Sequence, residues 1–128
     1  MNSRTILLVL LTLGTLAALA ATPVGAGFAF KPFACDFGSS PDWVATIVNV
    51  RHLLSFGVLA VLAFLVFRGQ PIWAPIVFML VVTGVVEIEE GLFASGHCRM
   101  RDMIPDVLAI GIGWIAARFV PSRWLKAA

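Results

Sequence analysis

The sequence predicts an all-α membrane protein, a single domain folded as a bundle of four transmembrane helices with the N- and C-termini in the cytoplasm. The first reason is composition: hydrophobic residues make up 60% of the 128 residues and charged residues only 12%, whereas soluble domains carry roughly 25% charged residues. The second reason is that apolar residues gather in long runs, and a helix needs roughly 20 of them to cross a hydrocarbon layer about 30 Å thick. The mean hydropathy of +0.99 is likewise typical of a membrane protein.

The first predicted helix spans residues 5–26, within a run that carries no formal charge between Arg4 and Lys31. The same segment fits a second interpretation, because a positive residue, an apolar stretch and small residues at 18–20 or 25–27 also form the pattern of a cleaved secretory signal peptide. The sequence leaves both interpretations open.

Three further helices are predicted over residues 44–67, 72–92 and 103–120. A short link that ends at Pro71 joins the second helix to the third, and proline suits the start of a helix because a first-turn residue needs no N–H partner. Asp102 is expected to cap the fourth helix. No strand is expected.

Charges assign the two ends of this bundle to the two sides of the membrane. An N-terminus in the cytoplasm places slightly more basic residues inside than outside, in the sense of the positive-inside rule. The inner basic residues are Arg4, Arg68, Arg118, Arg123 and Lys126. Every acidic residue then lies toward the outer end. Cys35 and Cys98 also fall in outer segments, and because that compartment is oxidising in bacteria, we expect them to form a disulfide.

Charged residues on three of the predicted helices fall at one depth. At about 1.5 Å per residue, Arg51, Glu87 and Asp106 lie roughly 21 to 24 Å from the cytoplasmic ends of their helices. A charge at this depth normally faces a partner or a wet cavity. We therefore expect Arg51 to contact Glu87 or Asp106, since a guanidinium can hold one or two carboxylates.

Small residues recur along the last predicted helix, at Ala109, Gly113 and Ala117. Because small side chains allow two backbones to approach, this face predicts a close contact with another helix.

Helical spacing adds neighbours to the charged cluster, because residues three apart share a helix face. The candidate ligand-binding residues are Asn49, Arg51, His52, Glu87, Glu90, Arg99 and Asp106. Several of them are metal-ligand types, but the sequence has no His-Glu-x-x-His or Cys-x-x-Cys spacing. The sequence therefore favours an ion-paired cluster with no metal and no cofactor. The net charge of +2 and the scattered basic residues argue against a nucleic-acid partner.

Four segments of the chain resemble the VanZ-like membrane proteins. They read "NVRHLLSFG" (49–57), "EIEE" (87–90), "GHCRMRD" (96–102) and "DVLAIGIG" (106–113), and the resemblance covers roughly residues 44–120. The residues at matching motif positions are Asn49, Gly57, Glu87, Arg99, Asp106 and Gly113. The chain differs in having Glu90 where the family has Gln and Ile110 where it has Asn.

The resemblance implies a multi-pass protein of the bacterial inner membrane with a role in the cell envelope, of the glycopeptide-resistance type. Together with the acid-rich outer end, it predicts binding of an envelope component, such as a lipid headgroup or a lipid-linked precursor, among membrane lipids. The alternative is a structural or accessory subunit that packs against a partner membrane protein, with charges that only lock the helices together. Whether the protein is an enzyme stays open.

Overall fold

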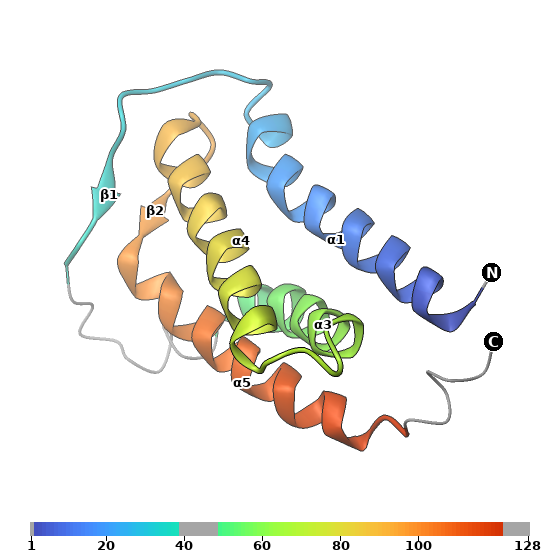
Figure 1. The fold of residues 1–128 in the computed structure, drawn as a ribbon. Coiled ribbons are helices and arrows are strands. Elements are labelled where there is room, and N and C mark those ends of the chain that lie inside the picture. Colours follow the sequence, from blue (N-terminus) through green and yellow to red (C-terminus); the bar gives the residue numbers. More distant parts are fainter. Residues whose placement is uncertain (1, 39–48, 122–128) are drawn as a thin grey trace.

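The computed structural model describes residues 2–38 and 49–121, and these are mostly helical (Figure 1). The helices are α1 (Ser3–Gly25), α3 (Val50–Val66), α4 (Trp73–Leu92) and α5 (Met103–Phe119). The prediction of a mostly helical chain is confirmed, the expectation that no strand occurs is wrong, and the predicted boundaries of α1, α4 and α5 are close to those observed. The second helix was predicted from residue 44, whereas the structure begins it at Val50 with Asn49 as its N-cap; residues 44–48 lie outside the described residues.

Asparagine side chains fix the starts of α1 and α3. Asn2 accepts a hydrogen bond from a backbone N–H of the first turn of α1 at 2.8 Å, and Asn49 does the same for α3 at 3.5 Å. Both bonds satisfy a donor that a helix N-terminus leaves without a partner. The prediction that Asp102 caps α5 is wrong: a 3₁₀ turn, η1 (Met100–Asp102), precedes α5, so the backbone of Asp102 is already helical and its side chain makes no capping bond.

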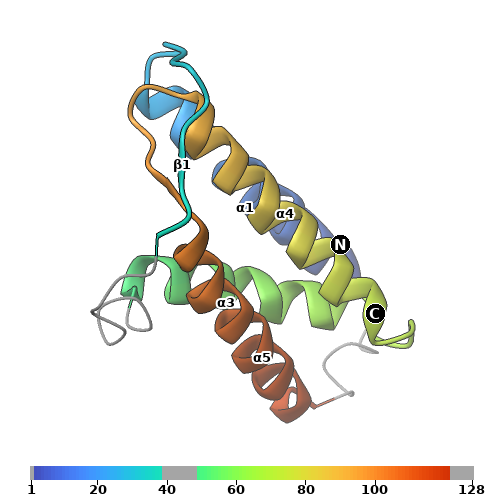
Figure 2. The same cartoon turned by 90° about the vertical axis from the view of Figure 1, so that its left-hand side faces the viewer.

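Helix α3 runs across the other three helices. It is seen nearly end-on in Figure 1 and lengthwise in Figure 2. The ends of α1 and α4 and the starts of α3 and α5 lie toward the same side of the molecule, on the left in Figure 2. We call this end the mouth, and it comprises residues 18–36, 49–56 and 86–106. The candidate site residues therefore come from helices that meet at one end.

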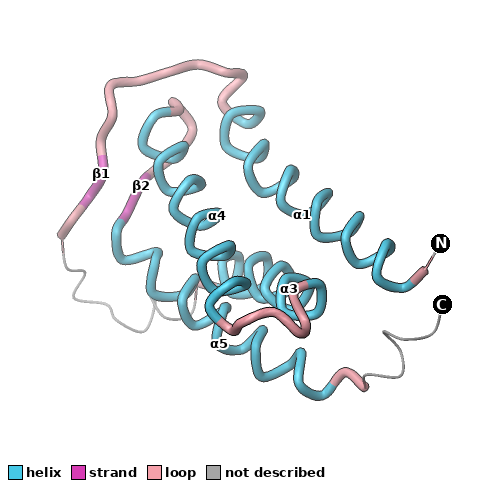
Figure 3. Tube along the Cα trace, viewed as in Figure 1, coloured by secondary structure: helices cyan, strands magenta, loops and turns pink. Residues whose placement is uncertain are grey.

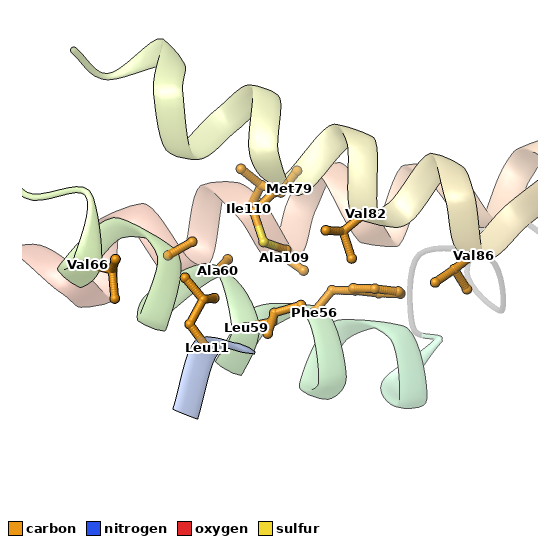
Figure 4. Packing of buried hydrophobic residues seen from close by; sticks show 11 residues of the cluster. Leu11, Phe56, Leu59, Ala60, Val66, Met79, Val82, Val86, Ala109 and Ile110 are labelled. Atoms are coloured by element: carbon orange, nitrogen blue, oxygen red, sulfur yellow. The ribbon is translucent and has the colours of Figure 1, made fainter. Parts of the chain in front are cut away.

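The hydrophobic core lies where α3, α4 and α5 meet, with α1 packed on its edge (Figure 4). Phe56 of α3, Met79 of α4 and Ile110 of α5 are buried together, and Met79 is fully enclosed. Leu11 of α1 is buried against α3 beside Leu59. Because buried side chains pack closely and tolerate few alternative arrangements, these contacts fix how the helices cross.

Helix α5 approaches α3 through small residues. Ala109 and Gly113 are buried on the face of α5 that meets α3. A Cβ atom added to Gly113 would lie 2.5 Å from the Cβ of Ala60 and 2.9 Å from the backbone nitrogen of Val61. The predicted close helix contact is confirmed.

Apolar side chains cover much of the outside of the helices. Among the described residues, α1 alone is both long and apolar enough to be a clear membrane-span candidate, and its 23 residues reach about 35 Å. Helices α3 and α5 have 17 residues each, yet they also expose apolar side chains such as Leu54 and Ile112. The crossing of four helices through a membrane remains a prediction.

A short strand pair (Figure 3) and a disulfide join two segments of the mouth. Strand β1 (Cys35–Asp36) pairs in parallel with β2 (Cys98–Arg99), which the sequence did not predict. The predicted disulfide between Cys35 and Cys98 is present, with the two Cα atoms 4.6 Å apart. It ties the segment after α1 to the segment before α5, so that prediction is confirmed.

Candidate functional site

A pocket of about 650 Å³ opens at the mouth between α1, α3, α4 and the loop after α4. Its apolar lining comes from Ala18, Ala21, Phe56 and Val86. Its polar lining includes Asn49, Arg51, His52, Glu90, Arg99 and Asp102. Most of the predicted site residues therefore line one pocket. Glu87 and Asp106 do not line it, but they are hydrogen-bonded to Arg99 and His52, which do.

The most deeply buried polar contact joins α3 to α5. The Nδ1 atom of His52 lies 2.8 Å from Oδ1 of Asp106, and the two residues are only 4% and 1% exposed. This hydrogen bond fixes the orientation of the imidazole ring and leaves Nε2 as the ring nitrogen available to another partner. The sequence placed both residues in the site but did not pair them.

The predicted partners of Arg51 were wrong. Its Nη2 atom lies 3.4 Å from Oε1 of Glu90, rather than beside Glu87 or Asp106, and its side chain is 79% exposed. Arg51 lies in the first turn of α3, next to His52, which points toward α5. Adjacent residues of a helix with 3.6 residues per turn point in different directions, so only one of the two can face α5.

Glu87 is held by the backbone of the loop that follows α4. Its Oε2 atom accepts a hydrogen bond from the backbone N–H of Arg99 at 3.3 Å. The residue is 4% exposed, and its Oε1 atom is buried with no hydrogen-bond partner within residues 2–38 and 49–121. The sequence named both Glu87 and Arg99 as candidate site residues, and the structure shows that the contact between them is made by the main chain of Arg99.

A third acid, Asp102, joins this cluster from the turn η1 just before α5. One ring nitrogen of His52, one carboxylate oxygen of Glu87 and one of Asp102 lie within 4.8 Å of one another. The sequence treated Asp102 as a helix cap, although its spacing of four residues from Asp106 indicated a shared helix face. Imidazole and carboxylate groups at this separation are a donor set that could hold a divalent metal ion.

The loop after α4 closes one side of the pocket and touches α1. The Oγ atom of Ser95 donates a hydrogen bond to the carbonyl of Thr22 at 3.3 Å, and Nζ of Lys31 donates one to the carbonyl of Gly96. A Cβ atom at Gly96 would lie 2.5 Å from the Cα atom of Glu90, so only glycine allows this close approach.

The contribution of α1 to the pocket was missed from the sequence. Ala18, Ala21 and Thr22 line it together. Their spacing of three and four residues places them on one helix face, and this spacing was the available signal.

No family model matches this chain, and no curated protein or solved structure is significantly similar to it. The family resemblance therefore rests on the quoted motifs. The structure places Asn49, Glu87, Arg99 and Asp106, which carry four of those motif positions, together at the mouth.

Proposed function

We propose that the chain is a VanZ-like multi-pass protein of the bacterial inner membrane and that its mouth pocket binds the polar headgroup of an envelope lipid or lipid-linked precursor. The observation that carries the proposal is the mixed lining of the pocket, with apolar side chains from α1, α3 and α4 beside charged and polar ones. An amphiphile presents both kinds of surface, so a membrane lipid is the class of ligand that such a lining suits.

The apolar exterior supports a membrane environment. Large apolar side chains are exposed on all four described helices, for example Leu13, Leu54, Ile88 and Ile112. Extensive exposed apolar surface marks a membrane or partner interface, because water-soluble surfaces rarely carry it. In this proposal α1 is retained as a helix of the fold, because it buries Leu11 in the core and forms part of the pocket wall.

The disulfide and the basic residues support the proposed orientation. The Cys35–Cys98 disulfide belongs to the mouth, and disulfides form in oxidising compartments. Arg68 lies in the turn between α3 and α4, and Arg118 near the end of α5, both at the end opposite the mouth. Arg123 and Lys126, which support the same orientation, lie outside the described residues. The mouth would then open to the extracytoplasmic side.

Two arginines of the pocket offer hydrogen-bond donors for a phosphate group. Arg51 and Arg99 both line it, and the Arg51 side chain is largely exposed despite its contact with Glu90. A guanidinium donates paired hydrogen bonds that match phosphate geometry. A phosphate-bearing headgroup is therefore the proposed ligand.

The test compares Arg99→Gln with Arg101→Gln in the full-length protein. Both variants lose one positive charge from the same loop, but Arg101 is not among the residues that line the pocket. In lipid nanodiscs we expect Arg99→Gln to weaken binding of an anionic phospholipid about tenfold, the loss that corresponds to one hydrogen bond to a charged group. Arg101→Gln should bind as the wild type does.

The same pair of variants is then compared in cells at matched membrane abundance. We expect glycopeptide sensitivity to change with Arg99→Gln and to stay at the wild-type level with Arg101→Gln. Lipid binding that is equal in all three proteins would contradict the proposed function.

The second candidate function is that of a structural subunit, and the polar contacts between helices favour it. The His52–Asp106 pair joins α3 to α5, and the Arg51–Glu90 pair joins α3 to α4. In that case Glu87→Gln and Asp106→Asn would lower the abundance of the protein, whereas Arg99→Gln would have no effect on lipid binding or phenotype.

A further inference from the structure

We propose that His52, Glu87 and Asp102 form a binding site for one divalent transition-metal ion of the Zn²⁺ type at the inner wall of the mouth pocket. The ligands come from α3, α4 and the turn η1, and one donor atom from each lies within 4.8 Å of the others. The inference deepens the function proposed for this pocket, but neither its geometry nor its test depends on a bound lipid.

Glu87 supplies an independent sign that a ligand belongs here. It is 4% exposed, and its Oε1 atom is buried without a hydrogen-bond partner in the described part of the chain. A buried carboxylate oxygen with no partner is costly, since it has lost its water without a replacement. A metal ion bound by the Glu87 carboxylate would offset the cost of burying it.

The charges around the cluster also point to a bound cation, because acidic groups outnumber their basic partners. Among the described residues, Arg51 pairs with Glu90, and His52 is hydrogen-bonded to Asp106. Neither pair includes Glu87 or Asp102, so two carboxylates face the same small volume without a cation. A divalent ion carries the two positive charges that would balance them, and mutual attraction at short range is strong away from bulk water.

Asp106 prepares His52 to act as a ligand. Because Nδ1 of His52 is hydrogen-bonded to Asp106 at 2.8 Å, Nε2 is the nitrogen that a metal ion would take. Metal-bound histidines usually donate their other ring N–H to a carboxylate, which fixes the tautomer and the ring orientation. The buried pair between α3 and α5 therefore has the arrangement of a supporting contact behind a metal ligand.

The chemistry of the donors selects the type of ion and its role. One imidazole and two carboxylates suit Zn²⁺ better than Mg²⁺ or Ca²⁺, which favour oxygen-only sites. His52 and Asp102 line the pocket, so the side of the ion away from its protein ligands would face it. Three protein ligands and an open position toward a pocket are typical of a zinc ion that binds a substrate oxygen, and a phosphate headgroup offers such oxygens.

The experiment uses the full-length protein in mild detergent, stripped with a chelator and dialysed against Zn²⁺ alone. Zinc per chain is measured by elemental mass spectrometry. We expect one ion per chain in the wild type and in His97→Gln, which removes a second histidine that lines the pocket but lies outside the cluster. We expect Asp102→Asn to lose stoichiometric binding. This variant should keep its fold, because Asp102 is only partly buried and belongs to neither ion pair.

A second measurement needs no variant. The zinc X-ray absorption spectrum of the loaded wild-type protein should show one imidazole among oxygen ligands. Absence of zinc from the wild type, unchanged binding by Asp102→Asn, loss of binding in His97→Gln, or a spectrum with two imidazoles or with sulfur would each overturn the metal site. None of these outcomes alters the comparison of Arg99→Gln with Arg101→Gln, so the two proposals can fail separately.

Discussion

Two glycines of α5, Gly113 and Gly111, allow the packing of α3 on α5 to be tested with one methyl group. Gly113 is buried, and an added Cβ atom would lie 2.5 Å from the Cβ of Ala60 and 2.9 Å from the backbone nitrogen of Val61. Contacts this short cannot be relieved by rotating a side chain, because the second neighbour is backbone. An added Cβ atom at Gly111 meets nothing within 4 Å.

The size of the effect follows from comparing Gly113→Ala with Gly111→Ala. Each substitution gains about 1 kcal/mol of helix propensity, and this gain cancels between the two variants because both glycines lie within α5. Overpacking of a tight interior costs about 1 to 3 kcal/mol, and only Gly113→Ala incurs it. We therefore expect the free energy of unfolding of Gly113→Ala to be about 1 to 3 kcal/mol lower than that of Gly111→Ala.

The assay is denaturant unfolding of the purified proteins in the same detergent, followed by helical circular dichroism. Gly111→Ala serves as the control for the propensity gain and for the added apolar surface. If Gly113→Ala proves as stable as Gly111→Ala, then α3 and α5 do not approach as closely as the structure shows, and the account of the small-residue face is refuted.

Three further outcomes are expected. Replacing Cys35 and Cys98 by serine should lower the free energy of unfolding by up to about 4 kcal/mol, because the bond closes a loop with a sequence separation of 63; equal unfolding curves with and without reductant would contradict this. Arg51→Gln should cost less than about 1 kcal/mol in the same assay, since the Arg51 side chain is 79% exposed and its distance to Glu90 is 3.4 Å, and a loss of several kcal/mol would show that the buried carboxylate of Glu90 depends on Arg51. A reporter fused after Ala128 should be active only in the cytoplasm, and periplasmic activity would refute the proposed topology.

The helices were predictable because they depend on local sequence patterns, and the disulfide because it depends only on which side of the membrane each cysteine is expected to face. A continuous apolar run of about 20 residues can satisfy its own backbone in lipid by forming a helix, which predicted α1, α4 and α5 closely. The disulfide prediction required only that Cys35 and Cys98 lie in segments on the same side of the membrane. The small-residue face of α5 was likewise evident from spacing, because glycine and alanine one turn apart allow another helix to pack closely against them.

The partners within the site depended on the tertiary structure. The sequence gathered Arg51, His52, Glu87 and Asp106 at one depth, but it could not say which of two adjacent residues on α3 faces α5. That choice depends on the rotation of α3 about its own axis and on its path across the other helices, both of which are set by core packing. A rotation of about 100° about the helix axis exchanges Arg51 for His52, and the sequence-based prediction chose the wrong residue.

The sequence by itself determined a strongly apolar helical chain whose acids, histidines and cysteine pair gather at one end. Composition and the spacing of apolar residues are enough to predict this, because they need no knowledge of tertiary contacts. Only the tertiary structure decided that His52 pairs with Asp106, that Glu87 is held by the backbone of Arg99, and that Asp102 joins them. These contacts join residues 12 to 54 positions apart in the chain. Their geometry follows from the path of α3 across the other helices and from the loop that the disulfide holds in place. Both depend on contacts between distant segments, so neither can be predicted from one segment alone.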